Sequence, residues 1–192
     1  MKQCIYIMIC IGLFSVTKIQ AQRCLPKQVG IELKGGFVDG FHGRKSDYTA
    51  YYGGVFVSTY TKSRDRWIVG AEYLTKYFPY KSKKYPVTQL TAEGSYLYNL
   101  LSDKGRNVFL SVGGSALFGY ETVNWNQKLL YDGAVLTDED SLIGGISGTL
   151  ELEIFITDKI VFLIDAEERI LFGGSTGNFH TQIGCGIKII IN

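Results

Sequence analysis

Residues 146–170 read ISGTLELEIFITDKIVFLIDAEERI, and both halves of this segment alternate between apolar and polar side chains. Leucine or isoleucine occupies every even position from 150 to 156, and Thr149, Glu151 and Glu153 alternate with them. A period of two is the repeat of a β-strand, whose successive side chains point to opposite faces. The polar triplet at 157–159 separates the halves as a short turn. The segment therefore predicts two antiparallel strands with one apolar face and one face that carries carboxylates.

Six further segments show the same character, so the sequence predicts eight strands. Each segment is rich in β-branched and aromatic residues and is bounded by Gly, Asp, Asn, Ser or Pro. The predicted strands span about residues 28–38, 50–61, 66–78, 86–99, 107–119, 142–156, 160–172 and 179–191.

The connections between these strands alternate between short and long. Short polar turns fall at 62–65, 100–106 and 157–159, and longer connections fall at 39–49, 79–85, 120–141 and 173–178. Outer-membrane barrels have short periplasmic turns and longer extracellular loops. We therefore expect the four longer connections to lie outside the cell.

A membrane-spanning protein of this sequence must be a barrel. After residue 21 no apolar run reaches the roughly 20 residues that a spanning helix needs, and a closed barrel is the other structure that pairs all of its backbone inside a membrane. The predicted fold class is all-β, a single eight-stranded antiparallel up-and-down transmembrane β-barrel of the outer-membrane type. A soluble β-sandwich has the same period, but the export signal and the carboxylates in mid-strand favour the barrel.

Residues 1–21 have the features of a cleaved secretory signal peptide, which leaves residues 22–192 as the barrel domain. Lys2 supplies the positive start, residues 5–16 form an apolar core, and residues 19–21 offer a cleavage site. A retained membrane anchor is the alternative, although Lys18 interrupts the apolar run. A lipoprotein modified at Cys24 is a further alternative, but arginine precedes that cysteine where a small residue is expected.

The exported chain has no net charge that indicates a nucleic-acid partner. Loss of Lys2 and Lys18 leaves 18 basic residues against 18 acidic ones, and nucleic-acid-binding domains usually show a basic excess. The remaining cysteines, Cys24 and Cys185, are not expected to form a disulfide. Cys185 lies six residues from the end of the last strand, roughly 20 Å from the barrel end that holds Cys24, whereas a disulfide needs Cα atoms within about 7 Å.

The polar strand faces predict a charged network inside the barrel. Eight strands leave an interior just wide enough for side chains to fill, and carboxylates buried there must be paired or hydrogen-bonded. We interpret the network as a structural plug, and a proton or ion pathway is the alternative. Its predicted members are Glu72, Glu93, Glu151, Glu153, Glu167 and Arg169, accompanied by Glu32, Asp165, Lys34 and Lys188.

Catalytic motifs are weak in this sequence. His42 and His180 are predicted at the same end of the barrel, where Ser46 or Ser175 would complete a Ser-His-acid site, but no G-x-S-x-G motif is present. A small barrel hydrolase that modifies lipid at the cell surface is the alternative function. The acidic residues of loop 120–141 lack the spacing of a known cation-binding loop. No cofactor and no metal is predicted.

Several segments resemble the conjugative transposon protein TraO family. They include LSVGGSALFGYETVNW at 110–125 and ERILFGGSTGNFHTQIGCGIKIIIN at 168–192, together with residues 58–74, 85–96 and 129–140. The resemblance extends over nearly all of the exported chain. It implies a role in the apparatus that moves a conjugative transposon from donor to recipient, and it brings no catalytic motif. The C-terminal Ile191-Asn192 departs from the aromatic residue on which outer-membrane barrels often end.

These observations predict a non-enzymatic outer-membrane component of a conjugative transfer apparatus, similar to type IV secretion, in an accessory or surface-contact role. The expected partners are other proteins of the conjugation machine and outer-membrane lipid, with no direct binding of nucleic acid. Long loops often carry function, and the 22-residue loop 120–141 is therefore the candidate partner-contact loop. Its candidate contact residues are Trp125, Tyr131 and Asp132.

Overall fold

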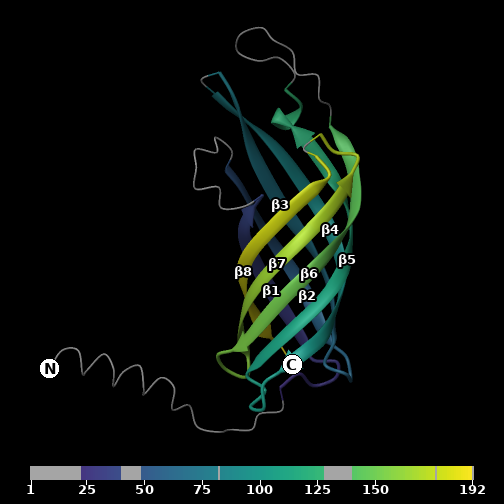
Figure 1. Cartoon of the computed structure of the whole chain (residues 1–192), viewed down its shortest axis with the longest axis vertical. Helices are drawn as coiled ribbons and strands as arrows, with labels where there is room; N and C mark the ends of the chain where they lie inside the picture. The colour runs from purple at the N-terminus through teal and green to yellow at the C-terminus, as the bar shows by residue number, and fades with distance from the viewer. Residues whose placement is uncertain (1–22, 40–48, 82, 128–139, 176, 192) are drawn as a thin grey trace, which may run out of the picture.

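The chain forms a closed β-barrel of eight strands (Figure 1). The computed structural model describes residues 23–39, 49–81, 83–127, 140–175 and 177–191. Each strand pairs antiparallel with the next, and β1 closes the barrel against β8. The predicted eight-stranded, up-and-down, antiparallel architecture is confirmed. The strands are β1 (Val29–Val38), β2 (Thr49–Tyr60), β3 (Arg66–Tyr80), β4 (Lys83–Ser102), β5 (Val108–Val123), β6 (Ser141–Phe155), β7 (Ile160–Phe172) and β8 (Phe179–Ile190).

Several predicted features lie outside the described residues. They are the signal peptide at 1–21, His42 and Ser46 in the first long connection, and Tyr131 and Asp132 in the candidate partner-contact loop. Within the described part of the chain, no helix is long and apolar enough to cross a membrane.

Both ends of the described chain meet at one end of the barrel, which we call the base (Figure 1). The Ile191 N–H donates to the Val29 carbonyl over 2.9 Å, and the Lys27 N–H donates to the Tyr60 carbonyl over 2.8 Å. The opposite end, which we call the mouth, holds the connections β1–β2, β3–β4, β5–β6 and β7–β8. Because the number of up-and-down strands is even, the first and the last strand have their chain ends at the same end of the barrel.

The prediction of a long loop at 79–85 is wrong. β3 and β4 continue pairing to Tyr80 and Lys83, so their connection is only residues 81–82. The rings of Tyr80 and Tyr85 pack edge to face across this hairpin at 6.2 Å. Pairing of β3 with β2 ends at Tyr77, and pairing of β4 with β5 begins at Val87, so the hairpin reaches beyond its neighbours at the mouth (Figure 1).

Two prolines mark the bounds of the predicted loop, because Pro79 begins it and Pro86 directly follows it. Pro79 and Pro86 lie where the strands have no outer neighbour, and a strand edge tolerates proline because no N–H is needed there. The connection after β5 is also shorter than predicted. β5 runs to Val123, a 3₁₀ turn follows at Asn124–Asn126, and β6 begins at Ser141.

The barrel wall is apolar outside and layered inside. Large apolar side chains such as Val69, Phe118, Leu142 and Phe172 are exposed on the outer face. Inside, apolar and charged layers alternate from base to mouth. The basal apolar layer consists of Cys24, Tyr60, Phe109, Phe155, Val161, Leu163 and Ile190.

The basal apolar layer explains an irregularity in the sequence of β7. Val161 and Leu163 share a face with Asp165, Glu167 and Arg169, and they break the apolar–polar alternation of the strand. Both are completely buried in the layer that closes the base of the lumen.

Candidate functional site

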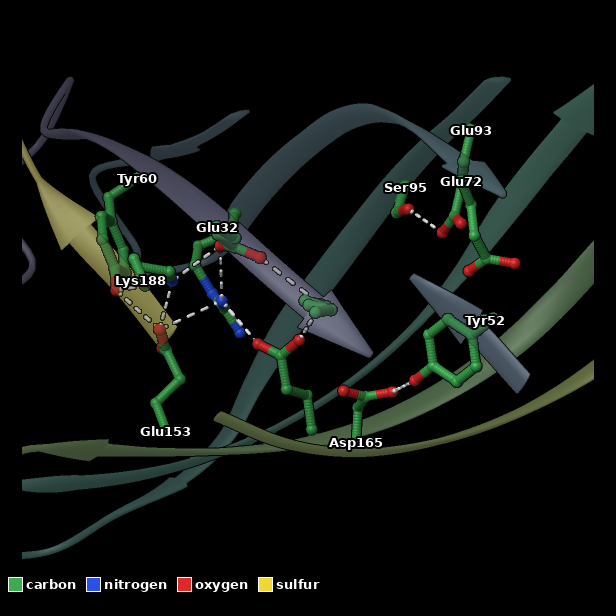
Figure 2. Close-up of polar contacts among 12 residues, drawn as sticks. Glu32, Tyr52, Tyr60, Glu72, Glu93, Ser95, Glu153, Asp165 and Lys188 are labelled. Carbon is green, nitrogen blue, oxygen red and sulfur yellow. Dashed lines mark hydrogen bonds and ion pairs between the residues drawn. The ribbon is translucent and has the colours of Figure 1, made fainter. Parts of the chain in front are cut away.

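Six charged side chains form a basal ion cluster that contacts the basal apolar layer through the Tyr60 hydroxyl, which bonds to Glu153. Figure 2 labels Glu32, Glu153 and Lys188 of this cluster. The six side chains come from β1, β3, β6 and β8, and period-two alternation turns all of them inward. The cluster holds three carboxylates and three cations, so its formal charges balance. Its members are Glu32, Lys34, Arg66, Glu151, Glu153 and Lys188.

The ion pairs of this cluster cross the whole interior. The Arg66 guanidinium on β3 lies 2.7 Å from Glu151 and 3.1 Å from Glu153, both on β6. Lys188 on β8 lies 3.0 Å from Glu32 on β1 and also pairs with Glu153. Lys34 pairs with Glu151 and lies 3.4 Å from Glu32. Because each carboxylate contacts more than one cation, the cluster ties together strands that are not neighbours in the sheet.

A second group, the upper acidic cluster, lies nearer the mouth and is separated from the first by the apolar side chains of Phe56, Ile68 and Leu97. Its only cation among the described residues is Arg169, which meets three glutamates. Two guanidinium nitrogens contact Glu72 at 2.5 and 2.8 Å. Glu167 lies 2.8 Å away and Glu93 3.3 Å away.

Neutral donors complete the upper acidic cluster. Gln182 donates to Glu72 over 3.1 Å, and Ser95 donates to Glu93 over 2.6 Å. The Tyr52 hydroxyl donates to Asp165 over 2.9 Å (Figure 2). Gly184 on β8 makes room for this tyrosine, because a Cβ at that position would lie 2.0 Å from the hydroxyl oxygen. With Asp165 included, the cluster holds four carboxylates, three of which contact Arg169.

A small cavity lies between the two clusters. Lys34, Glu72, Asp165 and Thr149 are among its lining residues. One carboxylate oxygen of Asp165 and the hydroxyl of Thr149 have no hydrogen-bond partner among the described residues, so both are positioned to bond to water there. Within the described residues, no group of three or more His, Cys, Asp or Glu side chains is placed to hold a metal ion.

A third polar group lies at the mouth. Asp39 accepts a hydrogen bond from Lys76 over 2.5 Å and lies 3.3 Å from His180 Nδ1. His180 Nε2 lies 3.1 Å from the Gly177 carbonyl oxygen. Partial burial raises the pKa of Asp39, but the hydrogen bonds from His180 and Lys76 outweigh this effect and lower the pKa to about 2.

The histidine and the serine considered for catalysis have other partners. The Ser175 hydroxyl donates to Glu121 over 2.7 Å, and Glu121 also accepts from Gln89 over 2.8 Å. His180 contacts Asp39 and Gly177 instead. Ser175 and His180 therefore do not form a nucleophile–base pair in this structure.

All six residues predicted for the lumen network are buried inside the barrel, but they divide between two clusters. Glu151 and Glu153 belong to the basal ion cluster, and Glu72, Glu93, Glu167 and Arg169 belong to the upper acidic cluster.

The sequence interpretation missed Arg66. The predicted strand 66–78 begins at Arg66, directly after the polar turn, but the predicted lumen network does not include this residue. Arg66, Ile68 and Glu72 nevertheless occupy alternate positions of one strand face, and extending this alternation back to the turn would have placed Arg66 inside.

The candidate contact residue that the structure describes, Trp125, is exposed at the mouth. It lies in the 3₁₀ turn after β5 with a φ of 53°, a left-handed conformation that is uncommon for a tryptophan. Its side chain is 62% exposed. The turn therefore presents a large aromatic surface beside the hairpin of β3 and β4.

The family model of the conjugative transposon protein TraO matches residues 25–191. This chain belongs to the TraO family. The match covers every strand and every cluster described above. A comparison with curated proteins found no match.

A solved structure shows the same fold at low sequence identity, and two others align with lower scores. Neisserial surface protein A aligns with a TM-score of 0.58 and 10% identity, over 85% of this TraO-family chain and 97% of that chain. The N-terminal β-barrel domain of Pseudomonas aeruginosa OprF aligns with a TM-score of 0.42 and 13% identity, over 85% and 98% of the two chains. The outer membrane protein OprG of the same species aligns with a TM-score of 0.43 and 13% identity, over 88% of this chain and 96% of that chain.

Proposed function

We propose that this TraO-family protein is a non-enzymatic outer-membrane component of the apparatus that transfers a conjugative transposon. The observation that carries the proposal is the polarity of the barrel. Ionic side chains such as Arg66 and Glu151 are completely buried, whereas large apolar side chains such as Leu142 and Phe118 are more than 60% exposed. A water-soluble protein has the opposite distribution, and a barrel in lipid requires an apolar outer band. Membership of the TraO family supplies the link to conjugation.

The proposed role is accessory or surface contact, not conduction of DNA. The interior of an eight-stranded barrel is filled by its own side chains, and here Arg66, Arg169, Phe109 and Tyr60 are buried across it. The basal ion cluster and the upper acidic cluster are accordingly proposed to be a structural plug. The partners are other proteins of the apparatus and outer-membrane lipid, and no direct contact with nucleic acid is proposed.

Export through a cleaved signal peptide at 1–21 and insertion with the mouth outward complete the proposal. In this orientation the short turns face the periplasm, as in other outer-membrane barrels. The connection from Asn124 to Asp140 then lies at the cell surface, and exposed Trp125 is its candidate contact residue.

The first test is the transfer frequency from donors that lack only this gene, with and without a complementing copy. A large loss that the copy restores supports a role in the apparatus. Fractionation of the same donors should recover the protein with outer membranes, and extraction should require detergent. Undiminished transfer, or recovery in the soluble periplasm, would contradict the proposal.

The second test separates the contact loop from the barrel. Replacing residues 128–139 by a short Gly-Ser linker leaves β5 and β6 complete. We expect impaired transfer while the barrel keeps the electrophoretic shift between heated and unheated samples. The matched control replaces residues 157–159 at the base with a linker of equal length, which should leave transfer intact. Normal transfer by the first variant would rule out the loop as the contact.

A further inference from the structure

One carboxylate of the barrel lies on the outer wall, not in the lumen. Glu168 on β7 points outward and is exposed, whereas its sequence neighbours Glu167 and Arg169 are buried in the upper acidic cluster. Exposed apolar side chains flank Glu168 on the base side and on the mouth side. They lie on β7 itself and on both neighbouring strands. These side chains are Ile164 and Phe172 on β7, Leu150 and Ile146 on β6, and Ile183 and Phe179 on β8.

The position of Glu168 places it within the apolar band. A strand tilted by about 45° rises roughly 2.3 Å along the barrel axis per residue. Phe172, four residues further along β7, therefore lies roughly 9 Å nearer the mouth. Ile160 lies roughly 18 Å nearer the base by the same reasoning. In the proposed membrane, the carboxylate thus faces acyl chains.

No cation among the described residues forms an ion pair with this carboxylate. The contact that the structure gives Glu168 is a hydrogen bond from the Thr181 hydroxyl, 2.5 Å long, and a hydroxyl carries no charge. The inward-facing Glu72 and Glu167 have Arg169 as a counter-ion. Ionisable side chains exposed to lipid are costly and usually mark a functional contact.

The wall beside Glu168 leaves room for another molecule. Gly148 on β6 lies in register with Glu168, and Gly114 on β5 lies in register with Gly148. A Cβ at Gly148 would meet no atom within 4 Å, so the surface there is open outward. A side chain of a neighbouring protein can therefore reach the carboxylate across this flat region.

We propose that the wall of β6, β7 and β8 around Glu168 docks a membrane-spanning segment of another protein of the transfer apparatus, which presents a lysine or arginine to this carboxylate. The inference rests on the proposed membrane location. A second copy of the chain fits less well, because a two-fold contact centred here would oppose the two Glu168 side chains, and like charges at short range repel.

The test compares variants that change charge and variants that do not. Glu168→Leu should keep or raise the urea midpoint of unfolding in neutral phospholipid vesicles, since it removes a charge from lipid. The same variant should lower transfer by more than about tenfold, because loss of one member of a buried charge pair weakens binding at least that much. Thr181→Val keeps the charge and should transfer normally. Val55→Leu, on the distant wall of β2, is the matched control.

A photo-crosslinking residue at position 148 identifies the occupant. We expect a crosslink to another apparatus protein in donors with the complete transposon, and its loss in the Glu168→Leu background. A crosslinked product with the mass of two copies of this chain would overturn the assignment. Normal transfer by Glu168→Leu in donors that need the gene would overturn this inference alone, whereas normal transfer by the gene deletion would overturn the proposed function.

Discussion

The basal ion cluster and the upper acidic cluster lie in one lumen but differ in how their charges are satisfied. In the basal ion cluster, three cations face three carboxylates. The upper acidic cluster holds four carboxylates and one cation, Arg169, which contacts three of them, and neutral donors from Tyr52, Ser95 and Gln182 supply the remaining contacts. Burial is nearly the same in both. We therefore expect the loss of stability on substitution to depend on the charge balance of a cluster and not on its burial.

The largest loss of stability is expected in the basal ion cluster, where cations and carboxylates are equal in number. Arg66→Met leaves Glu151 and Glu153 short of a cation in a fully buried site, and breaking such a group costs about 3–5 kcal/mol. Urea-induced unfolding in phospholipid vesicles measures the loss. Lys62→Met in the exposed turn is the control and should change the free energy of unfolding by less than about 0.5 kcal/mol. Equal stability of the two variants would show that the basal pairing does not hold the barrel together.

A second pair of variants compares the clusters directly. Glu151→Gln removes one of three balanced carboxylates and should destabilise the barrel by about 3 kcal/mol. Asp165→Asn keeps an oxygen that accepts from Tyr52 and removes one of four competing charges, so its effect should stay within about 1 kcal/mol of zero. The same unfolding assay reports both values. If Asp165→Asn proves the more damaging change, the charge-balance explanation is wrong.

A smaller loss of stability is expected when the space beside Tyr52 is filled. Gly184→Ala places a methyl group where the tyrosine hydroxyl now lies, so Tyr52 must leave Asp165, and overpacking of this kind costs about 1–3 kcal/mol. Gly53→Ala is the matched control, because the nearest atom to its Cβ would be 3.9 Å away. Comparable unfolding curves for the two alanine variants would argue against a role for the Tyr52–Asp165 contact.

The smallest effect is expected at the mouth and depends on pH. The pKa of Asp39 is lowered from its usual 3.8 to about 2. A lowered pKa means that the ionised side chain stabilises the folded protein above about pH 4, and that this stabilisation is lost as the pH falls towards 2. Asp39→Asn should therefore be less stable than the parent protein at pH 6 and equally stable near pH 2. A stability difference that does not change between these pH values would refute the ion pair.

Much of the barrel follows from period-two alternation, because a one-residue shift would reverse every side chain between wall and lumen. The alternation in β6 and β8 is by itself enough to place Glu151 and Lys188 inside. Three features were not predicted from the sequence, each for a physical reason. Two of them concern strand ends. They are the inward orientation of Arg66, which begins its strand directly after a turn, and the continuation of β3 and β4 into the predicted loop 79–85, where Pro79 and Pro86 occupy tolerated edge positions.

The third unpredicted feature is the division of the lumen into layers. Alternation along a strand specifies which face a residue occupies but not its height relative to residues of other strands. The height depends on the stagger of all eight strands around the barrel. The separation of the basal ion cluster from the upper acidic cluster therefore emerges only when the register of every pair is known.

The pairing of Glu32 with Lys188 links the first strand to the last, where the two residues lie opposite each other. These residues are far apart along the chain, so their encounter is a late and slow step of assembly. Until β8 arrives, the basal ion cluster lacks its third cation. A slip of β8 by two residues would bring Gly186 or Ile190 opposite Glu32, and neither carries a charge. The correct register is therefore favoured electrostatically, because a last strand in the wrong register leaves three buried carboxylates with only two cations, Lys34 and Arg66.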